Sequence, residues 1–180
     1  MRTLPLITLL VLAACGGTTP PGPGPDPSNE VSVGTGAQGG SGPFVPLEDG
    51  VELTLEPGAQ GGFHVYIDVQ VDEAAVAGMG ERPLVKRVAR RDPAGDLVSR
   101  SERTHVFIPS ATAGKVELEG VVPLFLCPTP IGIPVADETI ELEVEISKDA
   151  ETPGVKGTLR FIPRCPEGDQ AEFCRNICFG

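Results

Sequence analysis

The sequence contains no tryptophan, and aromatic residues make up only 4% of it. There is a single tyrosine, Tyr66, together with seven phenylalanines. Interfaces with proteins and carbohydrates usually depend on aromatic anchors, which combine a large apolar surface with defined geometry. The scarcity of aromatic residues therefore weakens the case for a flat platform on which sugar rings stack.

Positive charge is also scarce, because 14 Lys and Arg residues stand against 25 Asp and Glu residues and give a formal net charge of −11. Proteins that bind nucleic acid need a basic surface to neutralise phosphates, and docking on anionic lipid headgroups needs one as well. The composition argues against both partners. It favours an acidic domain that stays soluble through mutual repulsion.

The apolar run near the N-terminus, residues 4–12, is too short to span a bilayer, which takes roughly 20 residues. It follows the basic Arg2 and precedes small residues, an order that predicts a secretory signal peptide over residues 1–14. The segment Leu12-Ala13-Ala14-Cys15 resembles the lipobox of bacterial lipoproteins. An alternative is an ordinary secretory signal with an incidental cysteine at the cleavage site.

The lipobox resemblance implies that the Cys15 thiol receives a diacylglyceryl group and that the new amino terminus is acylated, for example with palmitate. Because each buried methylene contributes about 0.8 kcal/mol, several acyl chains would hold the protein on a membrane durably. Gly16 and Gly17 follow the cysteine, where this family commonly carries Asp for retention at the inner membrane. The resemblance therefore implies anchoring in the cell envelope, at the outer membrane.

A tether is predicted over residues 15–43, because this segment is rich in Pro, Gly and Ser and has few large apolar side chains. Five prolines between residues 20 and 27 fix φ and remove backbone donors, which opposes both helix and sheet. A folded domain is predicted over 44–163, with a Cys-rich tail over 164–180 attached to it.

Strict alternation of apolar and polar residues over 63–71 and 140–146 predicts two half-buried strands. Segments 84–91 and 97–100 flank a turn with Pro93 and Gly95 and predict a hairpin. Further strands are predicted at 51–55, 104–108, 116–118, 121–126 and 157–162. The pattern is typical of an all-β protein, an antiparallel β-sandwich of immunoglobulin-like architecture, with a Greek-key β-barrel as the alternative.

Four cysteines remain after Cys15, and an even number in an exported chain predicts two disulfides. The four are Cys127, Cys165, Cys174 and Cys178. Of the three possible connectivities we favour Cys165–Cys174 with Cys127–Cys178, because Cys174–Cys178 would close a very short loop. A four-thiolate zinc site is the alternative, although zinc ligands usually come in C-x2-C pairs. We expect no bound metal and no cofactor.

The chain has only two histidines, His64 and His105. His64, Tyr66 and Asp68 alternate along one strand, so their side chains share its polar face, and with His105 they are the candidate ligand-binding residues. The alternative is a solvated or hydrogen-bonded strand face. The segment Gln60-Gly61-Gly62-Phe63-His64 also resembles a strand entry in uncharacterised bacterial lipoproteins, which implies no activity.

Basic residues crowd the predicted hairpin, and Glu141, Glu143 and Glu145 line one face of another strand. The basic residues are Lys86, Arg87, Arg90, Arg91, Arg100 and Arg103. If the two segments are neighbours, cross-strand ion pairs form between them; otherwise the hairpin offers a basic surface to an acidic partner.

The sequence contains no assembled catalytic motif, such as the G-x-S-x-G elbow of serine hydrolases. We therefore expect a non-catalytic interaction module of the cell envelope, held by lipid and contacting an envelope or extracellular protein. A small-ligand or metal-binding protein that uses the face around His64 is the alternative. A hydrolase of unfamiliar type is the third possibility.

Overall fold

A computed structural model describes residues 30–37, 40–129 and 132–179. The predicted signal peptide and the predicted lipidation site at Cys15 lie outside the described residues. Among the residues that are described, no helix is both long enough and apolar enough to cross a membrane.

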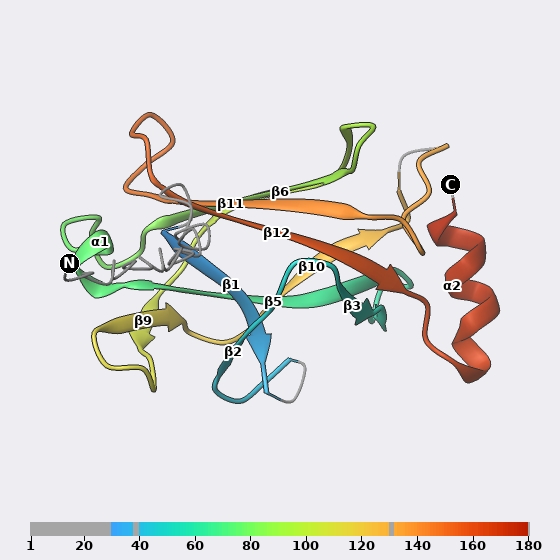
Figure 1. Cartoon of the computed structure of the whole chain (residues 1–180), viewed down its shortest axis with the longest axis horizontal. Helices are drawn as coiled ribbons and strands as arrows, with labels where there is room; N and C mark the ends of the chain where they lie inside the picture. Colours follow the sequence, from blue (N-terminus) through green and yellow to red (C-terminus); the bar gives the residue numbers. More distant parts are fainter. Residues whose placement is uncertain (1–29, 38–39, 130–131, 180) are drawn as a thin grey trace, which may run out of the picture.

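The protein is a β-sandwich of two sheets, as the strand pattern predicts, and not a single closed barrel. Figure 1 shows β6 and β11 on one side of the molecule and β5 on the other, with α2 at one end. The first sheet contains β1 (Val31–Gly36), β2 (Phe44–Pro46), β4 (Glu56–Pro57), β5 (Phe63–Asp72), β8 (Phe107–Pro109), β9 (Lys115–Leu118) and β10 (Val122–Cys127).

The second sheet has the strand order β3-β12-β11-β6-β7. Its strands are β3 (Val51–Thr54), β6 (Leu84–Arg91), β7 (Asp96–Thr104), β11 (Ile140–Ser147) and β12 (Val155–Arg164). The pairing is antiparallel apart from β3, which runs parallel to β12. The predicted hairpin is confirmed as β6 and β7.

The core lies between the inner faces of the two sheets. The apolar positions of β5 and β11 that the alternation predicts as one face are buried, with Ile67, Val69, Leu142 and Val144 fully shielded from solvent. Each such side chain contributes about 1.5–3 kcal/mol when it leaves water. The amphipathic pattern of the sequence is therefore the main determinant of the sandwich.

The long strand β5 organises the first sheet, because different strands pair with its two halves. Its first half pairs with β10 and β4, and its second half pairs with β1 and β9. In the described part of the chain, β10 pairs only with β5 and β7 pairs only with β6. The sandwich thus has free strand edges where β10 and β7 approach each other.

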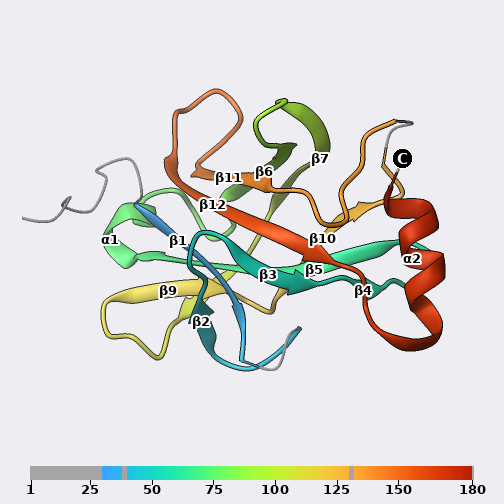
Figure 2. The ribbon, with the colours of Figure 1, turned by 45° about the vertical axis from the view of Figure 1, so that its right-hand side comes forward.

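On the opposite side, the two sheets meet closely where β1 passes β12. A Cβ added at Gly157 would lie 2.1 Å from the carbonyl oxygen of Val31, so only glycine permits this approach. Figure 2 shows β1 and β12 beside each other in this region. The sandwich is therefore closed along the contact of β1 with β12.

The predicted tether extends too far into the sequence. Residues 31–36, placed in the tether, form strand β1, and Val31 and Val33 are buried in the core. The glycine-rich composition concealed this strand, since its apolar alternation covers only two valines. Strand β2 likewise begins at the edge of the predicted domain.

The C-terminal tail is held on the domain by helix α2 (Ala171–Cys178), which follows a short 3-10 turn, Gly168–Gln170. The structure also contains a single helical turn, α1 (Glu73–Val76), directly after β5. Cys174 and Cys178 are four residues apart, so they share one face of α2, and both are fully buried.

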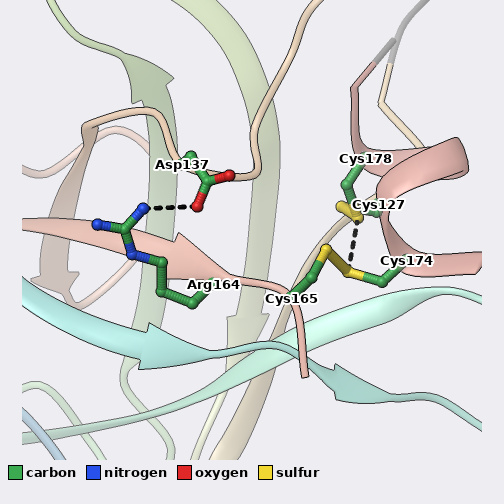
Figure 3. Close-up of a disulfide and its surroundings, with 6 residues drawn as sticks. All are labelled: Cys127, Asp137, Arg164, Cys165, Cys174 and Cys178. Carbon is green, nitrogen blue, oxygen red and sulfur yellow. Dashed lines mark hydrogen bonds and ion pairs between the residues drawn. A yellow bond between two sulfur atoms is a disulfide. The ribbon is translucent and has the colours of Figure 1, made fainter. Parts of the chain in front are cut away.

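Two disulfides fix this helix, in the predicted connectivity. Cys127–Cys178 joins it to the end of β10, and Cys165–Cys174 joins it to the segment after β12 (Figure 3). The ring of Phe173 also lies 5.9 Å from that of Phe63, centroid to centroid. The tail is therefore part of the folded unit.

The glutamates of β11 pair with cations on the outer face of the second sheet, but the predicted pairing with the hairpin is confirmed only for Lys86, and the other cations come from β12. Lys86 contacts Glu145 at 3.5 Å, and Arg160 of β12 donates to Glu141 at 3.1 Å. Lys156 lies between Glu143 and Glu145. Because these pairs are exposed or half-exposed, solvent screens them and each contributes little to stability.

Candidate functional site

A cluster of three rings lies at the start of β5. The imidazole of His64 contacts Tyr66 edge-on, with centroids 4.8 Å apart, and the ring of Phe125 lies 5.3 Å away. Phe125 is directly opposite His64 in the pairing of β10 with β5. The sheet register therefore brings together the only tyrosine, one of the two histidines and the most exposed phenylalanine that the structure describes.

The loop of residues 58–62 borders these rings and is fixed by backbone contacts. The amide of Gly58 donates to the carbonyl of Gly62 at 2.7 Å. A Cβ at Gly62 would lie 2.5 Å from the carbonyl oxygen of Cys127, so the chain enters β5 directly against the end of β10. This contact explains why glycine precedes Phe63 in the strand-entry segment.

A groove of about 620 Å³ lies over the rings. It is lined by the loop and by residues from β5, β7 and β10, namely Gly58, Ala59, Gln60, Gly62, His64, Tyr66, Arg103, Pro123, Phe125, Cys127 and Pro128. A second hollow of about 230 Å³ shares Arg103, Pro123 and Phe125 with it and extends along β7 to Arg87. We call these two adjoining hollows the ring–arginine groove. Together they have a size typical of small-molecule sites.

His64 lies at the buried side of the groove, with 6% of its surface exposed. Burial lowers the pKa of its imidazole, and the charge of Glu56 offsets part of that effect. Its Nδ1 atom is buried and has no hydrogen-bond partner among the described residues. At neutral pH the imidazole is therefore uncharged, and its Nδ1 atom is both shielded from solvent and without a partner among the described residues.

Arg87 lies at the other end of the groove and is almost fully buried, with 3% exposed. Its guanidinium donates to the hydroxyl of Ser101 at 3.2 Å and to the carbonyl of Val122 at 3.3 Å. Burial lowers the pKa of Arg87 to about 10, and the nearby charge of Arg103 adds to the effect. Arg87 therefore remains a cation at neutral pH, and its acceptors among the described residues are neutral.

His105 follows β7 and lies near the same arginines, Arg87 and Arg103. Burial lowers the pKa of its imidazole, and the charges of Arg87, Arg103 and Arg82 lower it further. Its backbone amide donates to the carbonyl of Pro83. His105 is thus half-buried and uncharged at neutral pH, among arginines.

The predicted convergence of His64, Tyr66 and Asp68 is correct for only two of the three residues. His64 and Tyr66 contact each other and line the groove, whereas Asp68 is not among its described lining residues. Asp68 is 2% exposed and accepts a hydrogen bond from the Val69 amide. The polar face of β5 is therefore largely buried, and not open to solvent.

Burial raises the pKa of Asp68 to about 6, and the charge of Glu117 contributes in the same direction. Glu117 is itself buried, and its Oε2 atom has no hydrogen-bond partner among the described residues. Two carboxyl groups therefore lie close together in a low-dielectric region, where ionising both is costly.

The cysteine sulfurs form a compact group behind the groove. The Sγ atoms of Cys165, Cys174 and Cys178 all lie within 4.8 Å of one another, and those of Cys174 and Cys178 are 3.8 Å apart. Figure 3 shows the two disulfides side by side. Zinc binds thiolates, and these sulfurs are joined in disulfides, so they do not form the zinc site considered as an alternative.

Sequence reasoning did not select Arg87 and Arg103 as site residues, although a signal was present. In the alternation of β6, Arg87 falls on the same face as the buried residues Val85 and Ala89. An arginine at a core position is unusual unless it is paired or functional. The groove itself depends on contacts between β5, β7 and β10, which the strand pattern alone does not specify.

No protein-family model matches the chain, and no curated protein matches it. Among solved structures, it is similar to the CooA pilin subunit from enterotoxigenic Escherichia coli, with 12% sequence identity and a TM-score of 0.37. That match covers 77% of this chain and 99% of the pilin subunit. At this TM-score the similarity carries no argument about function.

Proposed function

We propose that the protein is an exported lipoprotein of the cell envelope, anchored by lipid at Cys15, whose β-sandwich acts by binding and not by catalysis. The anchor follows from the lipobox segment Leu12-Ala13-Ala14-Cys15. The binding role follows from the ring–arginine groove, which offers ring surfaces, cations and one unpartnered imidazole nitrogen.

The observation that carries the proposal of export is the pair of disulfides. Cys127, Cys174 and Cys178 are nearly or fully buried, and both bonds fix α2 to the domain. Structural disulfides persist in oxidising compartments and are rare in a reducing cytosol. This supports a protein that folds after leaving the cytoplasm.

The anchor is tested by metabolic labelling with an alkyne-bearing palmitate analogue, followed by membrane fractionation on a density gradient. We expect label on the parent protein and its recovery with outer-membrane fractions. The Cys15→Ala variant should lose the label and leave the membrane. Thr18→Ala, which retains Cys15, should behave as the parent. An unlabelled parent protein in the soluble fraction would contradict the anchor and leave the groove unaffected.

A metal-binding role is the second candidate, favoured by the unpartnered, buried Nδ1 atom of His64. Its test is the elemental analysis of protein purified from its own compartment, compared with His64→Ala. A stoichiometric metal that disappears in the variant would support this candidate. Metal-free protein from both would exclude it and leave binding of an organic ligand.

A further inference from the structure

The ring–arginine groove concentrates positive charge in an otherwise acidic protein. Arg103 lies opposite Val85 in the pairing of β6 with β7, and Arg87 is two residues beyond Val85. Arg87 and Arg103 are therefore diagonal neighbours on the inner face of the second sheet. Arg87 is at the buried base of the groove and Arg103 is exposed at its mouth.

Neither arginine forms an ion pair with any of the described residues, whereas several cations on the outer face of the same sheet do. Lys86, next to Arg87 in sequence, pairs with Glu145, and Arg160 pairs with Glu141. Acidic side chains are abundant, with 25 in the chain. On the inner face of β6 and β7, Arg91 pairs with Asp96 at the hairpin end, whereas Arg87 and Arg103 have no carboxylate partner among the described residues.

Burying a cation without a carboxylate partner is unfavourable, because the protein interior solvates charge poorly. Arg87 nevertheless remains buried, and its two acceptors, Ser101 and Val122, are both neutral. A second cation beside it, Arg103, adds repulsion. An anion that enters the hollow would remove both unfavourable effects, so the free protein is predisposed to bind one.

The other end of the groove is lined by aromatic rings and carries less positive charge. Phe125 is 56% exposed although phenylalanine usually lies in the core, and Tyr66 is half-buried beside it. The hollow around these rings is the larger of the two, at about 620 Å³. A ligand that fits the whole groove therefore has an anionic end and an apolar or ring-shaped body.

We propose that the ring–arginine groove binds an organic carboxylate, with its carboxylate between Arg87 and Arg103 and its body against Tyr66 and Phe125. Guanidinium groups recognise the planar carboxylate through paired, charge-assisted hydrogen bonds. A monoanion suits the site better than a phosphate dianion, because the net charge of −11 repels a dianion more strongly. This inference rests on the binding role proposed above but not on the lipid anchor.

The probe is 3-phenylpropionate, which joins a carboxylate to a phenyl ring, and its matched control is the uncharged 3-phenylpropionamide. Calorimetric titration of the processed, disulfide-bonded protein from the cell envelope should show binding of the acid. The amide should bind about tenfold more weakly or worse, since it lacks the charge-assisted hydrogen bonds. Equal affinities for acid and amide, or no binding of the acid, would overturn the proposal.

The two histidines, His64 and His105, are the only ones in the chain and serve as reporters of where the ligand lies. His105 lies near both arginines, and His64 lies between the rings of Tyr66 and Phe125. With ¹³C-labelled histidine, the acid should shift the imidazole signals of both residues in step with occupancy. If calorimetry shows binding but neither imidazole signal shifts, the ligand binds elsewhere and the assignment is wrong.

Arg103→Gln removes one cation from the mouth of the groove and should weaken binding of the acid about tenfold. Arg90→Gln is the matched control, because Arg90 is exposed on the outer face of β6 and bonds the carbonyl of Gly95. It should leave the affinity unchanged. Arg87→Gln should abolish binding; if it fails to fold, Arg103→Gln still decides the result. An equal loss of affinity for the acid in Arg103→Gln and Arg90→Gln would refute a specific site.

Inorganic phosphate distinguishes a carboxylate site from a general anion site. Added at the concentration of the acid, it should not displace 3-phenylpropionate from the groove. Displacement at equal concentration would overturn the preference for a carboxylate. Failure of any of these binding tests leaves the labelling result at Cys15 intact, so the two proposals fail separately.

Discussion

Replacing Asp68 by Asn should stabilise the protein at neutral pH, although it removes a hydrogen-bonded residue from the interior. Asp68 is 2% exposed, and its pKa rises from an ordinary value of 3.8 to about 6. Asn has nearly the same shape and retains an oxygen that accepts from the Val69 amide, a bond of 2.7 Å. The substitution therefore removes mainly the buried charge and its repulsion with Glu117.

The magnitude follows from the pKa difference. One pKa unit corresponds to about 1.4 kcal/mol, so a rise from 3.8 to about 6 corresponds to a penalty on the order of 3 kcal/mol once Asp68 is ionised. Between these two pH values the native state holds the proton more tightly than the unfolded state. The free energy of unfolding of the parent protein therefore falls as pH rises through this window.

Urea unfolding at several pH values from 4 to 7 measures this difference. Asp68→Asn should match the parent near pH 4 and gain stability progressively towards pH 7. Asp169→Asn, which removes an exposed carboxylate from the short 3-10 turn, should show no such trend. A variant that is less stable than the parent at pH 7, or a difference independent of pH, would refute the reasoning.

The disulfides and the contact between the sheets give two further predictions. Loop entropy predicts a cost of about 4 kcal/mol for Cys127→Ala/Cys178→Ala, whose separation is 51, and about 2.6 kcal/mol for Cys165→Ala/Cys174→Ala, whose separation is 9. Chemical denaturation of the two double variants should rank them in this order, and the reverse order would contradict the loop-entropy account. Gly157→Ala should lower the melting temperature by several degrees, as a destabilisation of about 1–3 kcal/mol implies. An unchanged melting temperature in calorimetry would contradict the close contact of β1 with β12, because the added methyl group would then fit between the strands without strain.

The strands that the sequence predicts most clearly are those with one buried face. Segments 63–71 and 140–146 correspond closely to β5 (Phe63–Asp72) and β11 (Ile140–Ser147), because alternation reports directly which face meets the core. The sequence does not indicate strand β1 because glycine occupies two of its six positions, and glycine has no side chain to reveal a buried face. Its placement depends on pairing with β5 and on contact with β12, which are tertiary effects.

The candidate site was predicted in part. The neighbouring positions of His64 and Tyr66 follow from the period of a strand, and the structure confirms their contact. The separate environment of Asp68 does not follow from that period, because it depends on Glu117 from another strand. The cationic end of the groove does not follow from the sequence for a similar reason, since the basic residues alternate between the two faces of β6 and only the packing of the sheets shows which face is buried.

The two halves of β5 also separate the groove from the point where the described chain enters the sandwich. Val31, where the described chain enters the sandwich, pairs with Val71 near the end of β5, whereas His64 lies near its beginning. Val71 is seven positions after His64 along the strand, a span of about 23 Å at 3.3 Å per residue. The groove and the entry of the described chain therefore lie toward opposite ends of β5, so a ligand can occupy the groove without meeting the segment that leads into Val31.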